Sequence, residues 1–269
     1  MNLTETVYDP AVALAFFKSV GSPEDIAQGA TIFAENDRRS RIYLLLRGEV
    51  SLHAGSKRIG TVKAAEIFGE LAVIDRAPRS ASAVAAAPCR VIALNEEKFN
   101  HALRLQPAFA LMLMSTMIHR LRLTIARLQE TGAINQDEAW KEGAAFKPQH
   151  LRDLARGLTE HSSMYYRQGQ EIMAEGQTGT RMYAVLEGRV AVSIGGRVVE
   201  KLGPGGVFGE AALVNKRARM ASAVAEVDCM LLPIERQAFL AMVKLSPQFA
   251  NIVLTSLAER LRFLTARIP

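Results

Sequence analysis

The chain contains the tripeptide Phe-Gly-Glu twice, and an arginine follows each copy at the same distance. The copies begin at Phe68 and Phe208, and Arg79 and Arg219 each stand nine residues after the glutamate. A glycine-led turn into a short helix presents free backbone N–H groups that suit a phosphate, and a guanidinium can donate two parallel hydrogen bonds to phosphate oxygens. A carboxylate would repel a phosphate, so its natural partner is a neutral donor such as a sugar hydroxyl. Together these groups indicate a ribose-phosphate ligand.

The repetition extends far beyond these motifs, so we refer to a first and a second repeat. A shift of 140 residues superimposes the two without a gap and matches Gly29 with Gly169, Tyr43 with Tyr183, Cys89 with Cys229 and Arg120 with Arg260. This period exceeds the roughly 20 to 50 residues of solenoid and propeller units and fits a domain of ordinary size. The sequence therefore predicts two tandem domains, at residues 1–131 and 148–269, joined by a linker at 132–147.

Each repeat shows the same order of elements. Apolar residues at helical spacing predict an opening helix at 9–20 and another at 148–162. Runs of β-branched and aliphatic residues between Gly, Asn and Asp turns predict an antiparallel sheet or barrel. In the first repeat these strands are expected at 42–46, 50–53, 58–62 and 90–94. Helices at 95–105 and 107–130 follow, and 247–267 repeats the long amphipathic closing helix. The predicted fold class is α+β, mainly β with flanking helices.

Composition limits the class of protein. Of the 269 residues, 49% are hydrophobic and 22% are charged, which suits two buried cores and does not suit a disordered or fibrous chain. The first 20 residues carry Glu5 and Asp9 and no basic leader, and no stretch contains roughly 18 consecutive apolar residues. We therefore expect a soluble, cytoplasmic protein without membrane attachment. Cys89 and Cys229 lie in apolar segments, which favours buried free thiols.

The net charge of +6 invites a nucleic-acid hypothesis, because clustered Lys and Arg supply most of the sequence-independent affinity for phosphate backbones. The arginines are, however, spread through both repeats, and only seven residues follow Arg262, too few for a helix-turn-helix reader. We expect a solvated basic surface and no direct nucleic-acid binding.

The distribution of the histidines along the sequence argues against a metal-dependent enzyme. Small β-barrels that host metal chemistry need clustered ligands, commonly two or three histidines with a carboxylate. The five histidines are scattered and none has a counterpart in the other repeat: His53, His101, His119, His150 and His161. We expect no metal, no cofactor and no catalysis.

The order of elements and motifs resembles the cyclic nucleotide-binding domain. The segments that carry the resemblance run from Phe68 to Ala83, with Pro78-Arg79-Ser80-Ala81-Ser82 inside it, and from Phe208 to Ala223. The resemblance covers nearly the whole chain twice. It implies two small antiparallel β-barrels of the jelly-roll type, each with an inserted phosphate-cassette helix and with N- and C-terminal helices.

The resemblance also implies roles for the repeated residues. Arg79 and Arg219 would bind the cyclic phosphate, while Glu70 and Glu210 would accept from the ribose 2′-hydroxyl. The residues expected to bind the ligand are Phe68, Gly69, Glu70, Leu71, Ala72, Arg79, Ser80, Ala81 and Ser82, with Phe208, Gly209, Glu210, Ala211, Ala212, Arg219, Met220, Ala221 and Ser222. A structural alternative is that each Glu and Arg pair forms a buried ion bridge that stiffens its barrel.

Three further features leave alternatives open. The repeats differ in the four residues that precede the motif, which are Lys63-Ala64-Ala65-Glu66 in the first and Gly203-Pro204-Gly205-Gly206 in the second. The order of affinity of the two sites is therefore undecided.

Ser82 and Ser222 either contact the purine or bond locally to backbone. The family's base rate favours cAMP as the ligand, and cGMP stays open. An apolar lid over the base is expected from Leu121, Leu123 and Leu128 in the first repeat and from Leu261, Phe263 and Leu264 in the second, and Trp140 either stacks on the base or simply packs.

The resulting hypothesis is a cytoplasmic sensor of cAMP, alternatively cGMP, that binds ligand at two sites and moves its closing helices to signal to an effector protein. The alternatives are a regulator related to cAMP receptor-type transcription factors, whose closing helices would form a homodimer, and a kinase regulatory subunit. Either would act through a separate effector chain.

Overall fold

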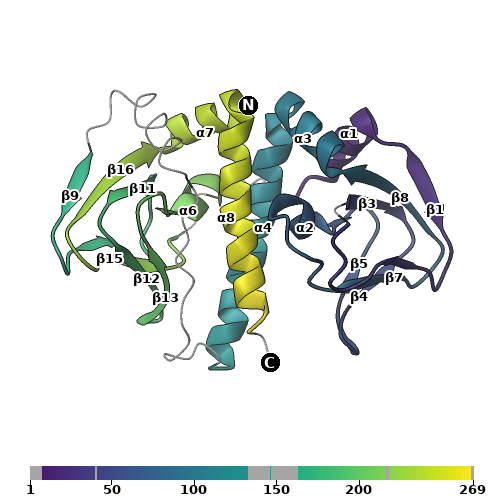
Figure 1. The fold of residues 1–269 in the computed structure, drawn as a ribbon, viewed down its shortest axis with the longest axis horizontal. Coiled ribbons are helices and arrows are strands. Elements are labelled where there is room, and N and C mark those ends of the chain that lie inside the picture. The colour runs from purple at the N-terminus through teal and green to yellow at the C-terminus, as the bar shows by residue number, and fades with distance from the viewer. Residues whose placement is uncertain (1–7, 40, 133–145, 147–162, 216–217, 268–269) are drawn as a thin grey trace. The chain divides into compact units, whose positions relative to one another are not determined.

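Two four-stranded antiparallel sheets form the body of each repeat (Figure 1). The computed structural model describes residues 8–39, 41–132, 146, 163–215 and 218–267. The contacts divide the chain into two compact units, one spanning Tyr8–Met112 and the other including Leu113–Pro269. The predicted domain boundaries remain a prediction. Nearly all of the predicted linker, Trp140 and the helix expected at 148–162 lie outside the described residues.

In the first repeat the sheets have the strand orders β1-β8-β3-β6 and β2-β7-β4-β5. Side chains from both sheets meet in one buried cluster that includes Tyr43, Val50, Phe68 and Val91, so the two sheets share one core. The elements are α1 (Pro10–Val20), β1 (Pro23–Ile26), β2 (Thr31–Phe33), β3 (Arg41–Arg47), β4 (Val50–Ala54), β5 (Lys57–Val62), β6 (Ile67–Phe68), α2 (Glu70–Ile74), β7 (Ser82–Ala85), β8 (Cys89–Asn95), α3 (Glu96–Leu105) and α4 (Pro107–Glu130).

The second repeat has the equivalent sheets, with the orders β14-β11-β16-β9 and β10-β15-β12-β13. Its elements are β9 (Met164–Tyr166), β10 (Glu171–Met173), β11 (Arg181–Glu187), β12 (Val190–Ile194), β13 (Arg197–Leu202), β14 (Val207–Phe208), α6 (Glu210–Asn215), β15 (Ser222–Ala225), β16 (Cys229–Glu235), α7 (Arg236–Leu245) and α8 (Pro247–Thr265). The α+β class, the predicted strands and the described predicted helices are confirmed, and so are the two buried free cysteines.

Local sequence signals explain where the elements begin and turn. Asp9 caps α1 by accepting from the backbone N–H of Ala11, and Asn95 caps α3 by accepting from Lys98. The repeated Gly48 has a φ of 99°, and a Cβ there would lie 2.5 Å from the carbonyl oxygen of Pro88. Only glycine suits such a turn, which is why this position reads Gly in both repeats.

Aromatic side chains attach the flanking helices of the first repeat to one another. Phe16 of α1 stacks on Phe109 at the start of α4, with ring centroids 3.5 Å apart, and Phe99 of α3 meets Phe16 edge-on. All three are fully buried. Because such rings bury large apolar areas, they anchor the first turn of α4 in the core of the first repeat.

The helix α4 is more apolar than the sequence-based expectation allowed. By length and a mean hydropathy of 1.2 it is long and apolar enough to cross a membrane, and α7 and α8 pass the same test only when taken together across a bend of 112°. Of the apolar window in α4, 61% is buried inside the protein. A core helix passes this test as readily as a membrane span does, so this feature is weak evidence for either.

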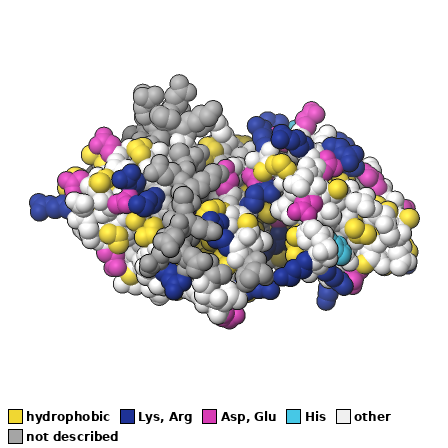
Figure 2. Space-filling model, turned by 60° about the horizontal axis from the view of Figure 1, so that its bottom comes forward, with side chains coloured by type: hydrophobic (Ala, Val, Ile, Leu, Met, Phe, Trp, Pro, Cys, Tyr) yellow, Lys and Arg dark blue, Asp and Glu magenta, His cyan; other side chains and the backbone are white. Residues whose placement is uncertain are grey.

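Charged side chains of both signs are interspersed on the surface. On the face shown in Figure 2, Lys and Arg lie over both repeats with Asp and Glu among them. Several of the basic groups pair with acidic neighbours, for example Arg76 with Glu96 and Arg189 with Glu226. Pairing of this kind offsets part of the net positive charge locally.

Candidate functional site

Each Phe-Gly-Glu motif forms the junction between a short strand and a short helix. Gly69 links β6 to α2 with a φ of 73°, and Gly209 links β14 to α6 with a φ of 84°. A Cβ at Gly69 would lie 2.7 Å from Nη1 of Arg79, and a Cβ at Gly209 would lie 2.6 Å from Nη1 of Arg219. Glycine is required at both positions because of the left-handed backbone and because the arginine passes so close.

The arginine of the first repeat is buried in a cradle of backbone carbonyls. Arg79 is 3% exposed and donates from Nη1 to the carbonyl of Gly69 at 2.7 Å. Its Nη2 donates to the carbonyls of Arg39 and Arg41 at 3.1 and 2.6 Å. The guanidinium also lies 4.0 Å from the centroid of the Phe33 ring, a cation–π contact. These contacts hold the positive charge in one place.

Arg219 of the second repeat is held in the same way. It donates from Nη1 to the carbonyl of Gly209 at 2.7 Å and from Nη2 to that of Arg181 at 2.6 Å. Burial lowers the pKa of Arg219 from its ordinary value, against the opposing effect of Tyr183 and Glu210, yet an arginine stays protonated in proteins. These bonds use two of its five N–H groups, so three remain for a ligand as far as the described residues show.

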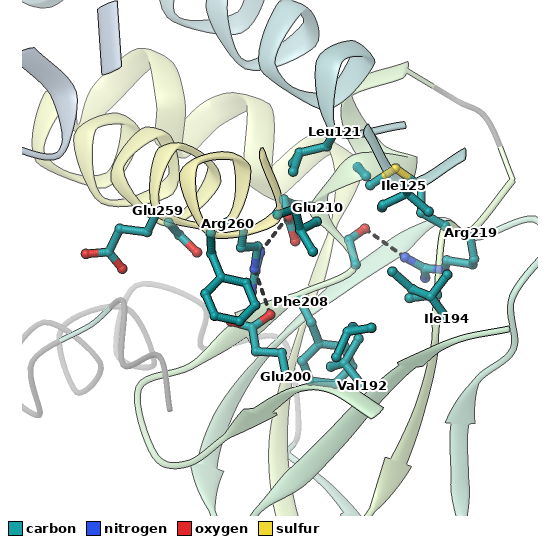
Figure 3. Close-up of a pocket in the computed structure, with 18 of the residues that line it drawn as sticks. Leu121, Ile125, Val192, Ile194, Glu200, Phe208, Glu210, Arg219, Glu259 and Arg260 are labelled. Carbon is teal, nitrogen blue, oxygen red and sulfur yellow. Dashed lines mark hydrogen bonds and ion pairs between the residues drawn. The ribbon is translucent and has the colours of Figure 1, made fainter. Parts of the chain in front are cut away.

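A cavity of about 170 Å³ lies beside Arg219, and we call it the second cavity (Figure 3). A single buried water needs only roughly 10 to 15 Å³, so this space is larger than a packing defect. Apolar side chains of β12, among them Val192 and Ile194, line it together with the charged Glu210, Arg219 and Arg260. An apolar pocket with a few convergent polar groups is the usual form of a small-molecule site.

Glu210 presents an unsatisfied acceptor to this cavity. The residue is 4% exposed, and its Oε1 accepts a hydrogen bond from Nη1 of Arg260 at 2.8 Å. Its Oε2 is buried and has no hydrogen-bond partner within the described residues. A buried carboxylate oxygen left without a donor is costly, so this atom suits a ligand that brings a hydroxyl or N–H group.

Arg260 of α8 connects the closing helix to the barrel of the second repeat. It pairs with Glu210 and donates from Nε to Glu200 on β13 at 2.9 Å (Figure 3). Its Nη2 donates to the carbonyl of Val207. Burial alone would lower the pKa of Arg260, but the carboxylates of Glu200 and Glu210 raise it above its ordinary value. Burial raises the pKa of Glu200, against the opposing effect of Arg260.

In the second repeat, Glu210 and Arg219 therefore do not form the buried ion bridge that the structural alternative requires. Both hydrogen bonds of Arg219 go to carbonyls, and the ion pair of Glu210 is with Arg260 at 2.8 Å. The reason is geometric, since the cradle fixes the guanidinium against the turn while α8 brings a second arginine to the carboxylate.

The closing helix α8 lines the cavity with one face. The lining residues on this helix follow helical spacing and are Ile252, Thr255, Ser256, Glu259, Arg260, Phe263 and Leu264. Of the expected lid residues for the second repeat, Phe263 and Leu264 lie there, whereas Leu261 is buried without lining the cavity. Leu121, expected as a lid for the first repeat, lines the second cavity together with Ile125, while Leu123 is 59% exposed.

The expected ligand residues of the second repeat mostly come together. Phe208, Gly209, Glu210, Ala211, Arg219, Met220 and Ala221 all line the second cavity. Ala212 belongs to α6, and Ser222 begins β15. The hydroxyl of Ser222 accepts from the backbone N–H of Glu175 at 2.9 Å, so it bonds to backbone as the alternative expects, but to a residue distant in the sequence and not to a local one.

The expected residues of the first repeat occupy the corresponding elements. Phe68 ends β6, the residues Glu70, Leu71 and Ala72 open α2, and Ser82 begins β7. Glu70 and Arg79 are buried, Ala81 is 8% exposed and Ser80 is exposed. The hydroxyl of Ser82 accepts from the N–H of Glu35 at 2.8 Å, as in the second repeat.

Among the lining residues that the sequence-based prediction missed, Arg260 and Glu200 carry the charges of the ion network. The sequence marks Arg260 as a repeated residue, because Arg120 stands at the same place in the first repeat, but the repetition alone does not indicate its function. Glu200 is not repeated, since Gly60 stands at the equivalent place in the first repeat, so the comparison of the repeats does not point to it. Within the described residues no group of three His, Cys, Asp or Glu side chains is placed to hold a metal ion. His150 and His161 lie outside the described residues.

Comparison with known proteins gives a consistent picture. The family model for the cyclic nucleotide-binding domain matches residues 23–105 and again 163–246, more than half of the chain. A cAMP-dependent protein kinase regulatory subunit from Eremothecium gossypii is 26% identical over 219 residues, covering 80% of this chain and 42% of the relative. A cyclic AMP receptor protein from Thermus thermophilus is 39% identical over 115 residues, covering 41% of this chain and 52% of the relative.

The chain thus spans about half or less of the length of these curated relatives. Among solved structures, the regulatory domain of Toxoplasma gondii PKA with cAMP is 22% identical. The match covers 89% of this chain and 87% of that chain, with a TM-score of 0.32. A score this low adds no weight to the family match.

Proposed function

Because the chain belongs to the cyclic nucleotide-binding domain family and carries two such domains, we propose that it senses a cyclic nucleotide, with cAMP as the preferred ligand, at two sites. The observation that carries the proposal is the second cavity, where a buried acceptor and a buried cation face the same space. The ribose 2′-hydroxyl donates to Oε2 of Glu210, and the cyclic phosphate accepts from the remaining N–H groups of Arg219. A cyclic nucleotide offers both groups on one sugar.

The first site uses the equivalent residues. Arg79 binds the phosphate and Glu70 accepts from the ribose, since the glycine turn and the carbonyl cradle have the same form as in the second repeat. The backbone amides at the start of α2 and α6, near Leu71 and Ala211, add donors to each phosphate. The proposal retains all eighteen residues of the two cassettes as ligand-binding residues, with Arg79, Arg219, Glu70 and Glu210 as the charged contacts.

The preference for cAMP rests on two of the relatives, a cAMP-dependent kinase regulatory subunit and a cyclic AMP receptor protein, while a cGMP-dependent protein kinase from Toxoplasma gondii is also similar to the chain. Because the hydroxyls of Ser82 and Ser222 accept backbone hydrogen bonds, they are partly engaged before a purine arrives. This leaves less capacity for the additional contact that would favour guanine.

The chain acts as a regulator without catalysis of its own. It transmits ligand binding through the closing helices to a separate effector protein in the cytoplasm, as a two-state element that the ligand biases. Binding directly to nucleic acid or to a membrane has no part in the proposal. Association into a homodimer through the closing helices is the alternative arrangement for the output.

Calorimetry with cAMP and with cGMP tests the proposal. Wild type is expected to bind two equivalents, while Arg79→Ala and Arg219→Ala each bind one and the double variant binds none. Each substitution removes a buried cation from a charge pair with the phosphate, which costs about 2 to 5 kcal/mol. Arg47→Ala, at the exposed end of β3, is the control and retains both sites. Absence of binding heat with either nucleotide in wild type would refute the function.

A further inference from the structure

The long helix α4 belongs to both repeats. It is one uninterrupted helix, yet its part from Leu113 onward falls in the same contact unit as the second repeat. Leu121 and Ile125, one helical turn apart, line the second cavity and are 2% and 9% exposed. Figure 3 shows both side chains among those around the cavity, although they come from the closing helix of the first repeat.

Arg122 on the same helix contacts the phosphate loop of the second repeat. Its Nη2 donates to the carbonyl of Ala218 at 2.8 Å, and Ala218 immediately precedes Arg219. The first repeat has Pro78 at this position. A proline ring restricts the backbone φ, whereas an alanine leaves it free. The hydrogen bond from Arg122 supplies a restraint that the second repeat lacks in its own sequence.

We propose that the closing helix of the first repeat is a structural part of the second nucleotide site. Arg122 is a positioning residue that holds the phosphate loop, and Leu121 and Ile125 form an apolar wall against the base. This inference rests on the proposed function of the cavity. It assigns these residues to the second site, although in the sequence they belong to the closing helix of the first repeat.

The arrangement makes the two repeats interdependent. The first turn of α4 is anchored in the core of the first repeat by the stack of Phe109 on Phe16, and its later turns complete the second cavity. Any ligand-driven displacement of α4 therefore changes the affinity of the second site, and by thermodynamic reciprocity occupancy of the second site biases α4.

The test uses the full chain in two backgrounds, Arg79→Ala to leave the second site alone and Arg219→Ala to leave the first. Arg122→Ala in the Arg79→Ala background is expected to weaken cAMP and cGMP by the same factor, about tenfold, as for loss of one positioning hydrogen bond. Arg122→Lys restores part of the loss, since an ammonium can donate to the same carbonyl. Arg127→Ala, exposed on the same helix, leaves the affinity unchanged.

The apolar wall is tested by Leu121→Ala in the same background. It removes contact with the base, so we expect it to weaken binding by about tenfold and to change the ratio of cAMP to cGMP affinity. Leu113→Ala is the matched control, because Leu113 is 1% exposed on the same helix and does not line the cavity. A purely structural role would make both leucine variants behave alike and leave the ratio fixed.

The outcomes separate this inference from the proposed function. If neither background binds a nucleotide, the proposed function fails. The inference about α4 is overturned, and the function stands, if the Arg79→Ala background binds nucleotide and neither Arg122→Ala nor Leu121→Ala changes its affinity more than twofold. The same holds if these two substitutions weaken binding at the first site equally in the Arg219→Ala background.

Discussion

The two repeats hold Arg79 and Arg219 in the same way and differ in the residues that surround these arginines. Arg79 and Arg219 both donate to the carbonyl of the motif glycine and to a carbonyl of the neighbouring strand. Around this common cradle, Glu200 of the second repeat stands opposite Gly60 of the first, and Gly179 stands opposite Arg39. The arginine that we propose to bind the phosphate is common to both repeats, whereas Glu200 and Gly179 beside it have no identical counterpart in the first repeat.

The largest expected effect comes from breaking the ion network of Arg260 with Glu200 and Glu210 in the second repeat. Arg260→Ala leaves the carboxylates of Glu200 and Glu210 without their cation, and such a buried imbalance costs about 3 to 5 kcal/mol in the free energy of unfolding. The double variant Glu200→Gly with Arg260→Ala recovers part of this loss, because it restores the glycine of the first repeat.

Denaturant unfolding of both variants measures this effect. Arg104→Ala, exposed near the end of α3, is the control and changes the free energy of unfolding by less than about 0.5 kcal/mol. If Arg260→Ala were no more destabilising than this control, the network would contribute nothing to the attachment of α8.

A smaller effect is expected from closing the space beside Arg219. A Cβ at Gly179 would lie 2.2 Å from Cζ of Arg219, so Gly179→Ala displaces the guanidinium from its cradle. We expect second-site affinity to fall about tenfold, or about 1.4 kcal/mol, in calorimetry on the Arg79→Ala background. The first repeat already carries a side chain at this position, as Arg39, so its site depends on no such space.

Gly60→Ala serves as the control for a general glycine effect, because a Cβ there would come no closer than 3.9 Å to a side-chain atom. Equal loss of second-site affinity in Gly179→Ala and Gly60→Ala would show that contact with Arg219 is not the cause.

The smallest effect concerns backbone strain before the motif. Ala65 has a φ of 69°, and its counterpart Gly205 has a φ of 91°. A non-glycine residue in this region costs roughly 1 to 2 kcal/mol. Ala65→Gly is therefore expected to stabilise the protein by about 1 kcal/mol, and Gly205→Ala to destabilise it by a similar amount. Thermal or denaturant unfolding of both variants checks the sign, and a change in the same direction in both would contradict the assignment to strain.

Much of this arrangement could be predicted from the sequence because duplication displays each functional residue twice. The glycine turn, the arginine and the strand pattern around Tyr43 and Tyr183 all repeat, so the family and the cassette follow from the match. The role of Glu200 could not be found this way, since a residue present in one repeat leaves no internal signal.

The position of α4 could not be predicted for a different reason. Leu121, Leu123 and Leu128 are equally apolar, and helical spacing alone does not say which barrel each residue meets. Only tertiary contacts show that Leu121 lines the second cavity while Leu123 is exposed. Similarly, the left-handed backbone at Ala65 could not be predicted, because alanine rarely adopts this conformation.

The carbonyl cradle of Arg79 has a consequence for the kinetics and the cost of binding. A free arginine side chain loses about 1.5 to 2 kcal/mol of conformational entropy when it is immobilised. Three backbone carbonyls and the Phe33 ring already fix this side chain in the folded protein. That entropy is lost during folding and not during ligand capture, so the phosphate of the proposed ligand would meet a cation that is already in place.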